Sequence, residues 1–142
     1  MKKIATSLLF FSTLFLVTAY GQDIKADKVP APVKSALVKK YPEAKGVSWE
    51  KEDGNYEANW GGKSGEDNSV QFTPSGDFIE IVHAITVNQL PPAALTYIKS
   101  NYKGAKIKEA GKVTDAKGKI TYEAEVNKKE LVFDENGNFV KK

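Results

Sequence analysis

The stretch VPAPVKSALVKKYPEAKGVSW, Val29 to Trp49, decides the fold because it predicts a helix that leads into a strand. Val33, Leu37 and Tyr41 recur at i, i+4 and i+8, which is the spacing of one apolar stripe on a helix. A proline suits the first helical turn, and Pro42 ends the helix. A single narrow stripe indicates that the helix packs on one surface only.

The same arrangement returns 61 residues later as LPPAALTYIKSNYKGAKI, Leu90 to Ile107. Ala94, Ile98 and Tyr102 form the second stripe, and Gly104 ends the second helix. Offsets of 61 or 66 residues relate further positions, namely Tyr56 to Tyr122, Phe72 to Phe133, Gly76 to Gly137 and Phe78 to Phe139. The sequence therefore predicts a duplication into two half-repeats, residues 29–85 and 90–142.

Alternation with a period of two follows each helix and predicts half-buried strands. In the first half-repeat, apolar side chains alternate with Glu57 and Asn59. In the second, they alternate with Thr121, Glu123 and Glu125. Asp-Gly and Asn-Gly pairs between the alternating segments are typical of hairpin turns.

We therefore predict an α+β fold, a tandem α-β-β-β-β repeat whose antiparallel sheet has two helices packed on one face and a polar face in water. The aromatic residues fall on the helix-covered face by their period. Trp60 lies beside the Gly61-Gly62 loop and is kept as a candidate for the surface. The sequence leaves open whether the half-repeats share one continuous sheet.

The N-terminus has the pattern of a secretory signal peptide, predicted for residues 1–21. Lys2 and Lys3 precede an uncharged apolar run, Ile4 to Ala19, and Ala19-Tyr20-Gly21 offers small residues for cleavage near Gly21. The run is shorter than the roughly 20 residues that a membrane-spanning helix needs. We expect a mature domain, residues 22–142, that is periplasmic or secreted without stable membrane insertion.

Composition excludes several classes of function. The 142 residues are 41% hydrophobic and 27% charged, as in a globular domain. There is no cysteine for a disulfide, a thiolate metal site or a nucleophile, and His83 is the only histidine. Without the leader, 19 lysines face 18 acids, a net charge of +1, and arginine is absent, so we predict no nucleic-acid partner.

Two segments look like chemical sites but have simpler readings. His83 lies in an apolar run without a second histidine, so we expect a strand histidine rather than a metal ligand. The segment from Asp134 to Asn138 resembles the start of a calcium loop but lacks its final glutamate, so we expect an Asn-Gly turn. We predict no metal, no cofactor and no catalytic residue.

The order and spacing of these segments resemble the PepSY-like family, described as β-lactamase-inhibitor-like secreted bacterial proteins. The resemblance covers about residues 29–142. It rests on the stretches Val29 to Trp49, Gly54 to Trp60 (GNYEANW), Val70 to Phe78 (VQFTPSGDF), Leu90 to Ile107, Ile120 to Val126 (ITYEAEV) and Leu131 to Phe139 (LVFDENGNF). It implies a non-catalytic, inhibitory or binding role, and it supplies no catalytic residues.

We predict an exported, non-enzymatic protein that engages another exported protein, a hydrolase or peptidase, through the open sheet face or a strand edge. The alternative is an envelope accessory protein that binds a small ligand or peptide between the half-repeats. We expect a monomer or weak dimer. The candidate partner-binding residues are Glu57, Asn59, Trp60, Thr121, Glu123 and Glu125.

Overall fold

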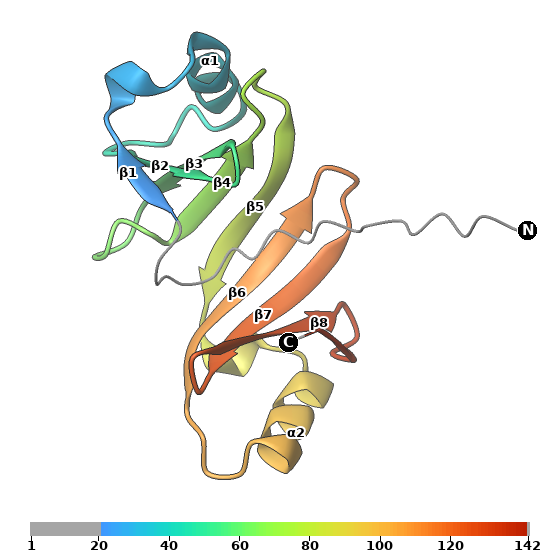
Figure 1. The fold of residues 1–142 in the computed structure, drawn as a ribbon. Coiled ribbons are helices and arrows are strands. Elements are labelled where there is room, and N and C mark those ends of the chain that lie inside the picture. Colours follow the sequence, from blue (N-terminus) through green and yellow to red (C-terminus); the bar gives the residue numbers. More distant parts are fainter. Residues whose placement is uncertain (1–20, 142) are drawn as a thin grey trace, which may run out of the picture.

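The computed structural model describes residues 21–141, in which the strands form one antiparallel sheet (Figure 1). The order of the strands in the sheet follows their order in the chain, so each pairs with its neighbours in sequence. The strands are β1 (Gln22–Ile24), β2 (Ser48–Glu52), β3 (Asn55–Trp60), β4 (Asn68–Phe72), β5 (Phe78–Ile85), β6 (Ile107–Asp115), β7 (Ile120–Val126), β8 (Lys129–Asp134) and β9 (Phe139–Lys141). The predicted signal peptide lies outside the described residues, apart from Gly21.

Two α-helices of ten residues occupy equivalent places in the two half-repeats: α1 (Ala31–Lys40) and α2 (Pro92–Asn101). Each has a proline in its first turn, as predicted for the first helix, and each is preceded by a short 3₁₀ helix, η1 (Ala26–Lys28) or η2 (Val87–Gln89). The sequence analysis missed these 3₁₀ helices, which are too short to show a periodic pattern.

Both helices pack on the same face of the sheet, as the fold class predicted. The first hydrophobic cluster joins Val33 and Leu37 of α1 to buried side chains of β2 to β5. The second joins Ala94 and Ile98 of α2 to side chains of β6 to β8. The two helix-covered surfaces are one face because Ile85, which packs against the second cluster, and Ile81 of the first cluster are four residues apart on one strand.

Strand β5 joins the two half-repeats into one continuous sheet. It pairs with β4 on one side and with β6 on the other, the latter over six residue pairs. The pair Ile85 and Ala110 repeats, 61 residues later, the pair Ile24 and Trp49 between β1 and β2. The end of β5 therefore pairs with the first strand after the helix in the second half-repeat, as β1 pairs with β2 in the first.

Two glycines at equivalent turns lie against the starts of the two helices. Gly76 and Gly137 both have positive φ, 88° and 84°. A Cβ at Gly76 would lie 2.7 Å from the carbonyl oxygen of Pro32, and one at Gly137 would lie 2.8 Å from the backbone nitrogen of Ala94. These glycines are 61 residues apart, and each lies where a hairpin turn contacts the start of the helix of its half-repeat.

Candidate partner-binding face

We use the term helix-free face for the side of the sheet opposite α1 and α2. Alternation along β3 and β7 directs Glu57, Asn59, Thr121, Glu123 and Glu125 to this face, because their neighbours in sequence lie in the hydrophobic clusters. Five of the six candidate residues therefore share one face.

Trp60 is the exception, and its placement at the surface was wrong. Its side chain is 6% exposed in the first hydrophobic cluster, and its ring centroid lies 5.4 Å from that of Tyr41. Trp60 shares the parity of Tyr56 and Ala58, so the strand directs it under α1 with them. Trp60 stays buried although Gly61 and Gly62 follow it.

The expectation of a solvated polar face was also wrong. Although neither α1 nor α2 covers them, the five remaining candidates are between 4% and 8% exposed. Ser69, Gln71, Val82, Val113 and Val132, whose strand pairings place them on the same face, are buried as well.

The sheet is curved toward its helix-free face. Glu130 on β8 raises the pKa of Glu52 on β2, although six strand spacings separate them. In a flat sheet that separation would be about 29 Å, well beyond the roughly 8–10 Å over which charges act in salt solution. The sheet therefore curls toward the helix-free face, which is concave.

Glu57 lies in a polar environment within this face. Burial raises the pKa of its carboxyl group, and hydrogen bonds with the side chains of Ser69, Asn59 and Gln71 lower it again. The single hydroxyl proton of Ser69 is donated to Oδ1 of Asn59 over 2.6 Å, so the amides of Asn59 and Gln71 are the donors left for Glu57. Nearby donors therefore stabilise the charged form of Glu57.

Glu123 occupies the equivalent position in the second half-repeat but has a different environment. Burial raises the pKa of its carboxyl group well above the ordinary value, and the charges of Glu130 and Glu80 raise it further. The residues directly opposite Glu123 are Gly111 on β6 and Val132 on β8, neither of which has a polar side chain. Its Oε2 is buried without a hydrogen-bond partner in the described part of the chain.

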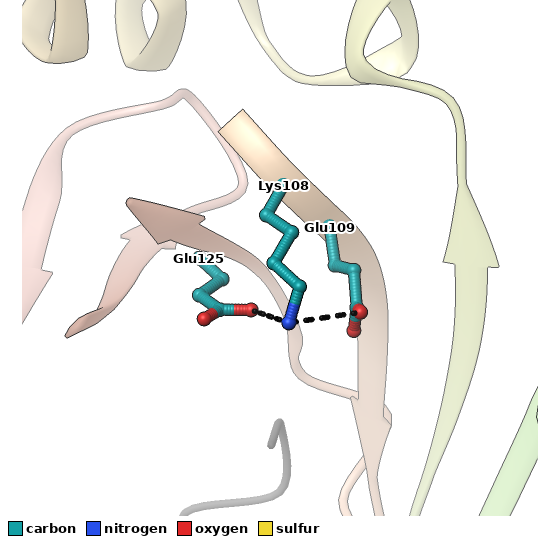
Figure 2. Close-up of polar contacts among 3 residues, drawn as sticks. All are labelled: Lys108, Glu109 and Glu125. Atoms are coloured by element: carbon teal, nitrogen blue, oxygen red, sulfur yellow. Dashed lines mark ion pairs between the residues drawn. The ribbon is translucent and has the colours of Figure 1, made fainter. Parts of the chain in front are cut away.

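Glu125 lies two residues further along the same strand and has an ion-pair partner. Figure 2 shows the Nζ of Lys108 between two carboxylates, 3.4 Å from Oε2 of Glu125 and 3.8 Å from Oε1 of Glu109. Oε2 of Glu125 nonetheless lacks a hydrogen bond, because the contact satisfies the ion-pair distance but not hydrogen-bond geometry. The Lys108 side chain is 64% exposed, so this pairing is only partly shielded from water.

The remaining sequence candidates do not form a chemical site. His83 is exposed, and its Nδ1 lies 2.9 Å from Oδ1 of Asn68. The Asp134 carboxylate accepts hydrogen bonds from the Asn138 side chain and from the backbone of Asn138 and Asn136, which lower its pKa, so this segment is the predicted turn. Residues 21–141 contain no group of three or more His, Cys, Asp or Glu side chains suited to a metal ion.

Sequence reasoning missed Ser69, Gln71 and Lys108 as members of the face. Ser69 and Gln71 alternate with Val70 and Phe72, so the period-two pattern could have identified them. Lys108 carries no such signal, because an irregularity in the pairing between Ile107 and Glu109 interrupts the alternation there.

A family model described as "Putative beta-lactamase-inhibitor-like, PepSY-like" matches the chain twice, over residues 16–63 and 60–141. The chain belongs to this PepSY-like family. Two successive matches agree with a tandem repeat, although they meet at residues 60–63, inside the first predicted half-repeat. Among proteins with curated descriptions, none matches the chain significantly.

Solved structures support the PepSY-like fold. A DUF2874 family protein from Bacteroides ovatus has a TM-score of 0.68 at 23% identity, covering 82% of this chain and 87% of its own. A "putative periplasmic" protein from Bacteroides eggerthii has a TM-score of 0.70 at 21% identity, covering 80% and 86%. A BLIP-like protein from Bacteroides fragilis has a TM-score of 0.63 at 24% identity, covering 79% and 84%. At these identities the likeness establishes the fold alone.

In the described range, neither helix is long and apolar enough to cross a membrane.

Proposed function

We propose that this PepSY-like protein is an exported, non-catalytic binding module that engages another exported protein through its helix-free face. The observation that carries the proposal is the set of polar side chains on that face, including carboxylates buried without full hydrogen bonding. Buried polar groups cost free energy when they lack partners, so their presence favours a role outside folding.

An inhibitor-like action on a hydrolase or peptidase is the specific form of this proposal. The description of the family and the BLIP-like neighbour support it. The predicted signal peptide and the neighbours described as periplasmic support a periplasmic location for the encounter.

The proposal can be tested by capture with the mature chain, residues 22–142, from an envelope extract of the source organism. Each captured protein is identified by mass spectrometry, purified and titrated against the bait. We expect Glu57→Gln with Glu123→Gln to weaken the affinity for an exported partner at least tenfold.

The matched control is Glu43→Gln with Glu135→Gln, which removes the same charge from two exposed positions away from this face. Its affinity should equal that of the unchanged protein. Equal binding by both double variants, or an empty capture with a folded bait, would contradict the proposed function.

A further inference from the structure

Each half-repeat places a glutamate at the equivalent position of the concave face, but the hydrogen-bonding surroundings of the two glutamates differ. Glu57 and Glu123 are related by the 66-residue offset of β3 and β7. Glu57 has hydrogen-bonding side chains around it, whereas Glu123 is only 4% exposed, with one oxygen unpartnered among the described residues. The second half-repeat therefore carries an acceptor that its own described side chains leave unused.

We propose that Glu123, with Glu125 beside it, is the receptor for a projecting basic side chain, lysine or arginine, of the protein partner. This inference rests on the proposed function and deepens it by naming the group that the partner presents. A cationic donor would give Oε2 of Glu123 and Oε2 of Glu125, which accept no hydrogen bond within residues 21–141, charge-assisted hydrogen bonds. Such bonds are about twice as strong as neutral ones.

The burial of both carboxylates favours a partner with a projecting side chain rather than a partner with a flat surface. Glu123 and Glu125 are 4% and 7% exposed, so a group must reach into the concave face to touch them. The two residues are i and i+2 on one strand and face the same way, about 7 Å apart. A basic group between them would contact one oxygen of each.

The charges around the position suit a cation. Glu130 and Glu80 both act on Glu123 with the sign that opposes its ionisation, and an incoming positive charge reverses that effect. Lys108 lies close to Glu125 but is largely exposed, and no ion pair joins it to Glu123 within residues 21–141.

A basic side chain fits better than a bare metal ion. Calcium takes six to eight oxygen ligands, and the residues that the structure describes contain no group of three or more His, Cys, Asp or Glu side chains suited to a metal ion. An ammonium or guanidinium group needs fewer acceptors and brings its own donors.

The test uses a penta-arginine peptide and its penta-citrulline counterpart, which has similar shape without charge. Each is titrated into the mature chain at 0.15 M salt, with binding followed by amide chemical shifts in NMR spectra. We expect the arginine peptide to shift amides in β7 and β8, and the citrulline peptide to bind at least tenfold more weakly. Glu123→Gln should weaken arginine-peptide binding about tenfold.

Glu43→Gln is the matched control, because it removes the same charge from an exposed position away from this face. It should change the affinity less than twofold, and circular dichroism should show both variants folded. Equal weakening by the two variants, or no preference for arginine over citrulline, would overturn the inference.

Failure here is distinguishable from failure of the proposed function. If a captured exported partner still depends on the helix-free face but the arginine peptide ignores Glu123, the binding role stands and the basic contact is wrong. If the peptide binds as expected but no exported partner is captured, the contact stands and the proposed function fails.

Discussion

Glu123 carries a carboxyl group that the fold buries without a hydrogen bond to its Oε2 in the described chain. Because its pKa is raised above the value in the unfolded chain, the folded state favours the protonated form. This contribution to stability is present at low pH and is lost as the pH rises through the raised pKa.

We therefore expect Glu123→Gln to stabilise the protein at pH 8. Removing the buried charge should raise the free energy of unfolding by about 1–2 kcal/mol, and the gain should shrink at pH 4. Urea unfolding at both pH values measures it. Glu57→Gln should gain less, because the glutamine replaces a carboxylate that already has hydrogen-bonding neighbours. A loss of stability in Glu123→Gln at pH 8 would contradict the account.

Glu52 gives a second pH-dependent effect. Burial, followed by the charges of Glu57, Asp53, Glu50 and Glu130, raises its pKa to about 7. Its contribution to stability should be complete below about pH 4.5 and fall away between there and pH 7.

Glu52→Gln should flatten that part of the pH profile. The change should be only a few tenths of a kcal/mol, since solvent screens a partly exposed group. Urea midpoints at pH 5 and pH 8 would show it, with the exposed Glu43→Gln as control. An unchanged slope would contradict the assigned environment.

Residue positions on the face were predictable, whereas residue environments were not. Period-two alternation correctly placed Glu57 and Glu123 opposite the helices. The curvature of the sheet brings Glu130 of β8 near Glu52 of β2, and no local pattern encodes a contact between strands so far apart. Trp60 follows the parity of Tyr56 and Ala58 into the core, and the adjacent Gly61-Gly62 loop does not expose it.

At the level of elements, the equivalent hairpin turns provide a matched test of the repeat. Gly76→Ala and Gly137→Ala each force a Cβ into a positive-φ turn and against the backbone at the start of a helix. Each should lower the free energy of unfolding by about 2 kcal/mol.

Gly118→Ala is the control, because Gly118 also has positive φ but a Cβ there would meet no atom of another segment within 4 Å. This substitution should lower the free energy of unfolding by about 1 kcal/mol, because only the positive φ opposes the alanine there. Thermal unfolding of the three glycine variants measures the difference in stability between them. Equal costs would show that the contact between turn and helix contributes nothing.

The helices were predictable because an apolar stripe, an initial proline and a terminal signal agree in both half-repeats. Strand β1 was not, because Gln22–Ile24 is too short to alternate visibly. The double use of β5 was hidden for another reason. The run from Phe78 to Ile85 has the pattern of the last strand of one half-repeat. Its pairing with β6 is a tertiary contact across α2, which the local sequence pattern does not indicate.

For the whole molecule, the continuous sheet predicts that the two hydrophobic clusters unfold together. Ile98→Ala removes buried volume from the second cluster and should cost about 2–5 kcal/mol. Both tryptophans, Trp49 and Trp60, belong to the first cluster, so their fluorescence reports on the half-repeat that was not changed.

We expect tryptophan fluorescence and far-ultraviolet circular dichroism to give the same, lowered unfolding midpoint for Ile98→Ala. Leu37→Ala, the equivalent change beside the tryptophans, is the control for the size of the effect. A fluorescence midpoint that stays at the unchanged value would mean that the half-repeats unfold independently.

The double use of β5 also bears on how the chain could be divided. A break in the segment 86–89 would leave β5 on one fragment and its partner β6 on the other, with six residue pairs to form across the break. Each fragment keeps its own helix and hydrophobic cluster, while each is left with an unsatisfied strand edge. The protein should therefore lend itself to fragment complementation, in which two separately made pieces recognise each other and restore the sheet without a covalent link.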